Sequence, residues 1–309
     1  MRVSTNGSYA AVLANLMAAQ QRQIEAGERS SSMKNGSDLK DFARNAEMLT
    51  AMRSVATRIS GYQDQNLLVA DRLNNQDTAL NQIANSASTT RQAIADALAS
   101  GRADSLMDDM QANMRDAVSG LNTRYGGKYL FAGGQIDTPP FEVTTLAQLT
   151  AAPTIAGLFK NDQFKAVSKV DDSTTVTTGM LASDVGTEMM NAFKAIQAFN
   201  EGPDGPITGE LTEAQRTFLE GQLSTWDTAA RNLTDKVGAN GLNQSRVDAV
   251  KADLVSRANN LGGMMGEIID ADMGKAVTDM QTAQLSVQAA AQVFNILQSS
   301  SLLNFLSSR

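Results

Sequence analysis

Residues 269–297 read IDADMGKAVTDMQTAQLSVQAAAQVFNIL and carry a regular apolar repeat. From Ile269 to Leu297, apolar residues follow one another in alternating steps of four and three. This heptad spacing is typical of a helix that packs in a coiled coil. The N-terminal segment has the same pattern over a shorter length, from Tyr9 to Ala19. The sequence therefore predicts a helix near each end of the chain, each with one apolar seam.

The residues of these two seams are the candidate interface residues, together with three apolar residues close to the C-terminus. The complete set is Tyr9, Val12, Leu16, Ala19, Ile269, Met273, Ala276, Met280, Ala283, Val287, Ala290, Phe294, Leu297, Leu302, Leu303 and Phe305.

Both terminal segments lack charge. Residues 3–21 contain no Asp, Glu, Lys or Arg, and neither do residues 280–308. From the heptad pattern alone, the two segments could be ordinary amphipathic helices of one bundle. A solvated helix, however, normally carries charges on its outer face. The uncharged faces therefore favour burial against several neighbouring subunits.

Composition limits the class of protein. The 309 residues allow two or three domains, and an aromatic content of 5% favours the thin seams of packed helices over a thick globular core. The formal charge of −7 is spread along the chain without a basic patch, which excludes the electrostatic footprint of a nucleic-acid-binding protein. No uninterrupted apolar stretch reaches about 18 residues, so no membrane span is predicted.

The residue types for most catalytic and metal sites are missing. The chain has no Cys and no His, which removes disulfides, thiolate nucleophiles, the usual zinc sites and triads with an imidazole base. Asp270 and Asp272 begin like a calcium loop, but Gly274 stands where the third oxygen ligand belongs. These aspartates are expected to cap or separate helices. We predict no catalytic residue, no cofactor and no metal.

The middle of the chain alternates between two kinds of sequence. Helical periodicity covers residues 42–99 and 104–124, gives way after Tyr125 to Gly, Pro and Thr-rich stretches, and returns from about residue 183. The predicted fold is mainly α, a long antiparallel helical rod or coiled coil formed by both termini, with a small β-rich domain inserted at its outer tip. Asn240-Gly241 is a strong turn signal, so the sequence leaves the continuity of the last long helix at this point open.

The predicted organisation has five parts. Residues 1–40 form the N-terminal part of an inner α-domain and are expected to be disordered in the monomer. Residues 41–134 form the first part of the helical rod, and residues 135–182 the β-rich outer domain. Residues 183–265 form the second part of the rod, and residues 266–309 complete the inner α-domain.

Four segments resemble a known family. They are MRVSTN at 1–6, YLFAG at 129–133 with TPPF at 138–141, EIIDADM at 267–273 and SLLNFL at 301–306. Together they resemble the flagellin superfamily over both helical ends and the entry to the insert, roughly 200 residues. The first two segments are most similar to those of the hook–filament junction proteins within this superfamily.

The resemblance implies a structural, non-enzymatic subunit of the bacterial flagellum. Such subunits are exported through the flagellar secretion channel by an uncleaved N-terminal signal, and they act outside the cell. Accordingly, the apolar stretch 9–19 fits a cleaved signal peptide poorly, since Arg2 is the only basic residue before it and Asn15 interrupts it. The implied partners are identical subunits in a ring, the first hook-associated protein, flagellin, an export chaperone and the secretion apparatus.

Two alternatives remain open at this stage. The chain could be flagellin itself, which would share the helices and their packing but form the bulk of the filament. It could instead be a cytoplasmic helical scaffold, or an enzyme whose site the motifs do not reveal.

Overall fold

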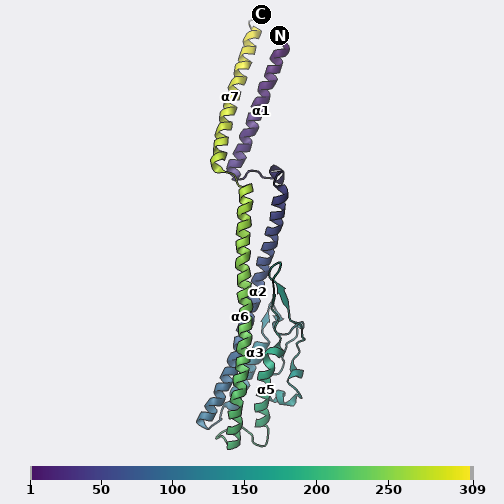
Figure 1. Cartoon of the computed structure of the whole chain (residues 1–309), viewed down its shortest axis with the longest axis vertical. Helices are drawn as coiled ribbons and strands as arrows, with labels where there is room; N and C mark the ends of the chain where they lie inside the picture. Colours follow the sequence, from purple (N-terminus) through teal and green to yellow (C-terminus); the bar gives the residue numbers. More distant parts are fainter. Residues whose placement is uncertain (1, 307–309) are drawn as a thin grey trace. The chain divides into compact units, whose positions relative to one another are not determined.

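The computed structural model describes the backbone of residues 2–306 and the side chains of residues 10–296. The chain divides into two compact units. Unit 1 comprises residues 1–59 and 256–309, and unit 2 comprises residues 60–255. The described chain is mainly helical with two small two-stranded sheets, so the predicted fold class is confirmed (Figure 1).

The long helices account for most of the chain. They are α1 Arg2–Ser32, α2 Ala46–Ser100, α3 Leu106–Leu121, α5 Ala182–Asn200, α6 Glu213–Ile269 and α7 Met273–Leu306. The shorter elements are the 3-10 turns η1 Leu39–Phe42 and η2 Ala156–Leu158, the helix α4 Leu146–Ala151, and the strands β1 Arg124–Tyr125, β2 Lys128–Tyr129, β3 Val167–Lys169 and β4 Thr175–Thr177.

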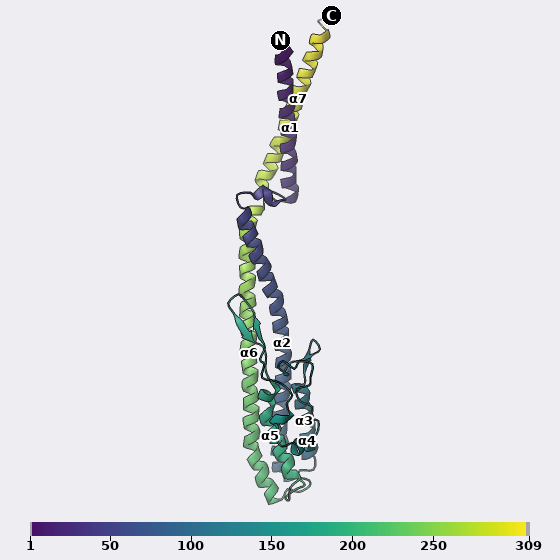
Figure 2. The ribbon, with the colours of Figure 1, turned by 90° about the vertical axis from the view of Figure 1, so that its right-hand side faces the viewer.

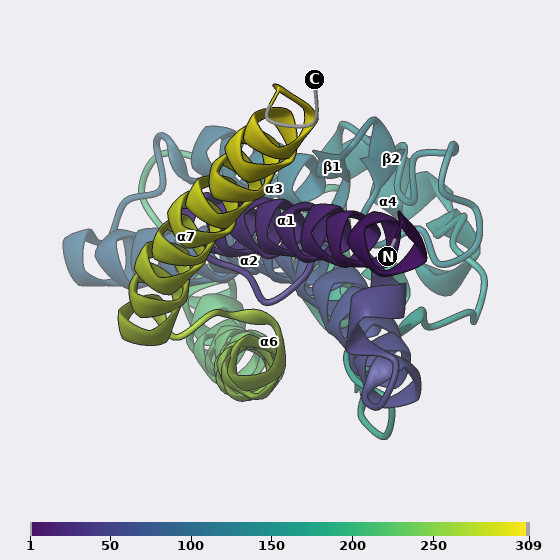
Figure 3. The ribbon, with the colours of Figure 1, turned by 90° about the horizontal axis from the view of Figure 1, so that it is seen from above.

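In unit 1, the two terminal helices α1 and α7 lie side by side (Figure 3). The segment that follows α1 is bound to the link between α6 and α7. The Asn35 backbone N–H donates to the carbonyl of Ile269 at 2.8 Å, and its side-chain amide donates to the carbonyl of Asp270 at 2.9 Å. The Ala271 N–H donates to the carbonyl of Met33 at 2.9 Å. These bonds hold the C-terminal end of α1 next to the N-terminal end of α7.

The C-terminal heptad repeat does not lie on a single helix. Helix α6 ends at Ile269 and α7 begins at Met273. The Lys275 N–H donates to the carboxylate of Asp272 at 3.1 Å, the bond of a residue that caps a helix N-terminus. The predicted continuous seam is therefore wrong across residues 270–272. The separating and capping role expected for the two aspartates is observed.

In unit 2, α3 and α5 lie beside α2 and α6 (Figure 2). These helices share one large apolar core. The core takes side chains from α2, α3, α5, α6 and the insert between α3 and α5. Its largest fully buried members are Leu80, Ile83, Ile94, Met110, Met114, Leu121, Phe131, Phe141, Phe193 and Trp226. Helix α2 ends at Ser100, and the next residue, Gly101, takes a left-handed φ of 72°, the conformation that commonly follows a helix C-terminus.

Helix α6 is continuous through Asn240-Gly241, despite the turn signal that left this point of the helix open. The Asn240 side chain is fully buried against α2, and its amide donates to the carbonyl of Leu73 at 3.0 Å. The Gln244 amide donates to the same carbonyl at 3.3 Å. This packing against a second helix outweighs the local turn preference of Asn-Gly, because propensity is a weak term beside tertiary contacts.

The insert contains less β-structure than predicted. Residues 135–182 hold one hairpin, in which β3 pairs with β4 antiparallel, together with α4 and η2, and the β1–β2 hairpin precedes them. Val170 and Val176 of the insert pack on Val69, Leu73 and Val247 in a small second core. Other insert side chains, Phe141 and Leu149 among them, belong to the large core. The insert has no separate core at a rod tip, because its apolar residues are shared with the helices.

The carboxylate of Asp162 binds backbone groups near the start of the insert. Asp162 accepts hydrogen bonds from the backbone N–H groups of Gly134 at 2.8 Å and Phe164 at 2.9 Å. These two bonds, the first the stronger, hold the pKa of Asp162 below its usual value. Gly133 has φ 66°, and a Cβ there would lie 2.2 Å from the Asp162 carboxylate. This position therefore requires glycine.

Candidate assembly surface

The α1–α7 pair is joined mainly through small apolar residues. Ala19 of α1 and Ala276 and Ala283 of α7 are buried, as is Ala26, which was not among the predicted seam residues. Short side chains let two helices approach closely, and they offer little apolar area of their own. One ion pair, Arg29 to Asp279 at 3.8 Å, links the helices, but both side chains are more than a third exposed and the pair adds little stability.

The other predicted seam residues fall into three groups. Met273 is exposed. Five side chains, those of Tyr9, Leu297, Leu302, Leu303 and Phe305, lie outside the described side chains. The half-buried group consists of Val12, Leu16, Ile269, Met280, Val287, Ala290 and Phe294.

The outward faces of both helices are also apolar. On α1, Met17 and Ile24 are 60% and 57% exposed and lie two turns apart on one face. On α7, Leu285 and Ile296 are 66% and 65% exposed, and Val293 also reaches the surface. At 100° per residue, Leu285 and Ile296 lie opposite the buried alanines of α7, and Met17 and Ile24 opposite those of α1, whereas Val293 lies about a quarter turn to the side. No charge interrupts α7 from residue 280 onward. The pair thus presents an apolar surface away from its own seam, which is uncharged on α7 and around Met17 and is bordered by Glu25 and Glu28 at Ile24.

These outward residues were missed by the heptad pattern, which selects only the seam. For Met17 and the residues of α7, the signal that could have found them is the absence of charge around the whole helix, whereas Ile24 lies beyond the charge-free residues 3–21. Apolar residues on every face of a helix indicate burial on every face. A monomer leaves this surface exposed, and large exposed apolar patches mark interaction sites. We define the assembly surface as Met17, Ile24, Leu285, Val293 and Ile296.

The described residues offer little to a small ligand at this surface. Among residues 2–306, no group of three or more Asp or Glu is placed to hold a metal ion. Nor does any of the described helices have the length and apolar character that a membrane crossing requires. The chemistry available at the assembly surface is the burial of apolar area against other protein.

Paired terminal helices with apolar outer faces, carried by a chain with a separate helical core, define a class: structural proteins that assemble through both ends of the chain. Comparison with known proteins identifies the family. The model of the bacterial flagellin N-terminal helical region matches residues 3–135, and that of the bacterial flagellin C-terminal helical region matches residues 223–306. The chain belongs to the flagellin family.

Individual flagellar proteins are also similar to this chain, in sequence or in fold. The flagellin FljK of Caulobacter vibrioides is 26% identical over 260 residues, which cover 83% of this chain and 89% of FljK. The crystal structure of Bacillus cereus FlgL aligns with a TM-score of 0.56 at 13% identity, over 70% of this chain and 99% of FlgL. Xanthomonas campestris FlgL gives 0.51 at 14% identity, over 69% and 98%. At such identities the two structures establish the fold.

Flagellin-family proteins are structural components of the bacterial flagellum. The chain is therefore a structural, non-enzymatic flagellar subunit that assembles with other flagellar components, and the prediction of a non-enzymatic subunit is confirmed by its family. This excludes the alternatives of a cytoplasmic scaffold and an unrecognised enzyme.

Proposed function

We propose that this subunit forms the junction between the flagellar hook and filament. The observation that carries the proposal is the alignment of nearly the whole length of FlgL with this chain. The segments 1–6 and 129–141, which resemble those of junction proteins, support it independently. A second candidate, flagellin itself, is favoured by the sequence identity with FljK.

In this proposal, the predicted seam residues and the assembly surface together form the subunit interface. Identical subunits in a ring bury one another's terminal helices, which removes the exposed apolar side chains of α1 and α7 from water. Burial of one large aliphatic side chain contributes about 1.5–3 kcal/mol. Several such side chains in every subunit make assembly favourable without disulfides, which a chain without Cys cannot form.

The remaining partners follow from the position of a junction. We propose contacts with the first hook-associated protein on one side and flagellin on the other, and an export chaperone before secretion. The subunit leaves the cell through the flagellar secretion channel without a cleaved signal peptide and works outside the cell.

Immunogold labelling of intact flagella tests the location. Gold is expected at a single band where hook and filament meet, with few copies in sheared filaments. Deletion of the gene is expected to leave hooks on the cell and to release flagellin into the medium. Label along the whole filament would instead establish the second candidate and overturn the junction proposal.

A separate prediction concerns the free monomer. We propose that residues 1–40 and 266–309 are disordered before assembly, because their apolar outer faces then lack the neighbouring subunits that would bury them. Limited proteolysis of dilute monomer should remove about 40 residues from each end and leave a resistant core. Mass spectrometry of the core locates the cuts, and equal protection of the termini and the core would contradict the prediction.

A further inference from the structure

The sequence contains three Asn-Gly pairs, at residues 6–7, 35–36 and 240–241. In such a pair the backbone nitrogen of glycine can attack the asparagine side-chain amide, because glycine has no Cβ to hinder the approach. Two of the pairs lie among the described side chains, and the structure places them in opposite surroundings. Asn35 is exposed in the segment after α1, whereas Asn240 is fully buried within α6.

Asn35 joins the end of α1 to the link between α6 and α7. Besides its bond to Asp270, the side-chain amide donates to the carbonyl of Ile268 at 3.3 Å. The backbone N–H of Asn35 also donates across this contact, so this one residue supplies three of its hydrogen bonds. We call the two segments that these bonds connect, residues 33–35 and 268–271, the α1–α7 clasp.

The structure also requires glycine at position 36. A Cβ there would clash with the Cβ of Asp41. The Asp41 side chain is itself held, because its carboxylate accepts hydrogen bonds from the backbone N–H groups of Ser37 and Asp38, both at 3.0 Å. Among residues 2–306, the Gly36 N–H donates to no acceptor. Asparagine is thus needed for the clasp and glycine for the turn after it, and the glycine nitrogen is available to react.

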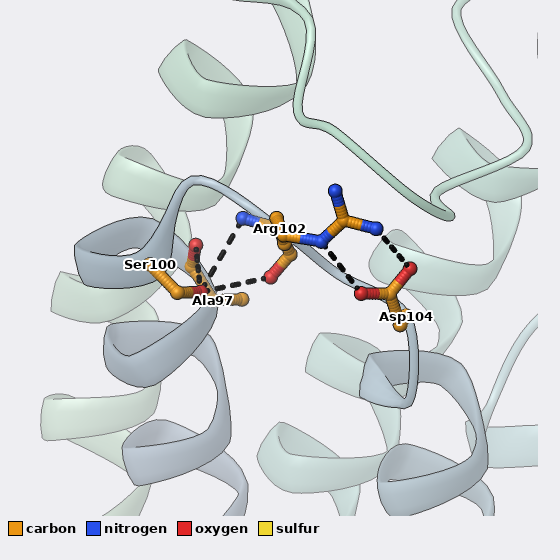
Figure 4. Close-up of polar contacts among 4 residues, drawn as sticks. All are labelled: Ala97, Ser100, Arg102 and Asp104. Carbon is orange, nitrogen blue, oxygen red and sulfur yellow. Dashed lines mark hydrogen bonds and ion pairs between the residues drawn. The ribbon is translucent and has the colours of Figure 1, made fainter.

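The backbone at the start of the clasp is strained. Met33 has φ 57°, a left-handed conformation that residues with a side chain rarely adopt. The left-handed position after α2 is instead Gly101. There, the Ser100 hydroxyl and the ion pair between Arg102 and Asp104 close the turn (Figure 4). Because a strained residue persists only while its surroundings hold it, the clasp opens more readily than the turn after α2.

We infer that Asn35 is a site of spontaneous deamidation in the free subunit, and that the product cannot re-form the α1–α7 clasp. The Gly36 nitrogen attacks Cγ of Asn35 and forms a new C–N bond, and the side-chain nitrogen leaves as ammonia with the proton of the attacking N–H. The product is a five-membered succinimide ring. Water then opens the ring at either carbonyl and yields aspartate or isoaspartate. Solvent water is the only other reactant.

The state of the clasp controls this reaction. The attack requires the Asn35 amide to turn from the carbonyls of the link toward its own backbone, so the clasp has to open first. Neighbouring subunits that bury α1 and α7 favour the closed clasp, whereas the free monomer lacks these contacts. The inference rests on that proposed burial of the terminal helices and is the same for a junction subunit and for flagellin.

Deamidation weakens assembly because it changes the groups that face the link. Aspartate lacks the two N–H donors of the amide, and its negative charge would lie against the carbonyl oxygens of Ile268 and Asp270. The assembly surface is carried by the two helices that the clasp joins. A modified subunit is therefore expected to assemble poorly.

Peptide mapping by mass spectrometry tests the site. Full-length subunit is incubated in one mildly alkaline buffer as free monomer, in assembled flagella, and unfolded in urea, where all three Asn-Gly pairs should convert. Asn35 in the monomer should convert within about tenfold of its rate in urea, and Asn240 at least about tenfold more slowly than Asn35, because its reaction requires the core of unit 2 to open. Asn35 in assembled flagella should also be protected.

Two results would overturn the inference. One is conversion of Asn35 in the monomer as slow as that of Asn240, and the other is equal conversion of Asn35 in monomer and flagella. Neither result bears on the location of the subunit, which the immunogold labelling tests separately.

The variants Asn35→Asp and Asn35→Gln test the consequence for assembly. Asn35→Asp carries the charge of the product from the start, and its amount in flagella should fall at least about threefold, the effect of losing hydrogen bonds of ordinary strength. Asn35→Gln keeps an amide and closes the corresponding six-membered ring far more slowly, so it should assemble without conversion at this position. Unchanged fluorescence of Trp226 shows that unit 2 is folded in both variants. Equal amounts of Asn35→Asp and wild type in flagella would contradict the role of the amide.

Discussion

Phe294→Asp is expected to leave export intact and to abolish stable attachment of the filament. Phe294 lies on α7 in the charge-free segment and is half-buried where α7 is packed as in the structure. In the proposed ring, neighbouring subunits bury the rest of the side chain. A carboxylate there would lie without water or a cation, which costs several kcal/mol per subunit, and the lost aromatic packing costs about 3 kcal/mol more. Every subunit of the ring carries the defect.

Two measurements check this result. Immunoblots of the culture supernatant should contain both the variant and unattached flagellin, and swimming should be lost. The control Ser245→Asp adds the same charge at an exposed position of α6 and should remain motile, as should Phe294→Leu, which keeps an apolar side chain. A motile Phe294→Asp strain with filaments of normal length would show that this face is not buried in the assembly.

Phe193→Ala is expected to destabilise unit 2 strongly. Phe193 is fully buried on α5, and its ring meets Trp226 of α6 edge-to-face, with centroids 4.7 Å apart and planes at 72°. Removal of a buried Phe leaves a cavity that the surrounding helices fill only in part, and the free energy of unfolding should fall by about 3–5 kcal/mol. The melting temperature should fall on the order of 10 °C.

Trp226 is the chain's one tryptophan, so its fluorescence reports unfolding at this contact without interference. Urea denaturation of the full chain, followed at this residue, gives the free energy directly. Phe164→Ala is the matched control, because Phe164 is 61% exposed and its removal should change the free energy by less than about 0.5 kcal/mol. Equal losses for the two variants would contradict the assignment of Phe193 to the core.

The candidate site was only partly predictable. The heptad spacing selected one face of each terminal helix, and Ala276 and Ala283 on that face are buried. The spacing could not locate the break after Ile269, because the apolar repeat keeps its step of four from Ile269 to Met273 across the link between α6 and α7. It also gave no indication of the outward residues Met17 and Leu285, because a seam pattern describes a single partner.

By itself, the sequence determined that this protein is mainly helical, that its two ends are apolar helices without charge, and that catalysis by Cys or His is impossible. These features are local: periodicity, residue type and the absence of charge act over a few helical turns. Only the tertiary structure decided that α6 continues through Asn240 and that the insert shares the core of the helices. Each of these depends on contacts between residues distant in sequence, whose burial and hydrogen bonds outweigh local preference.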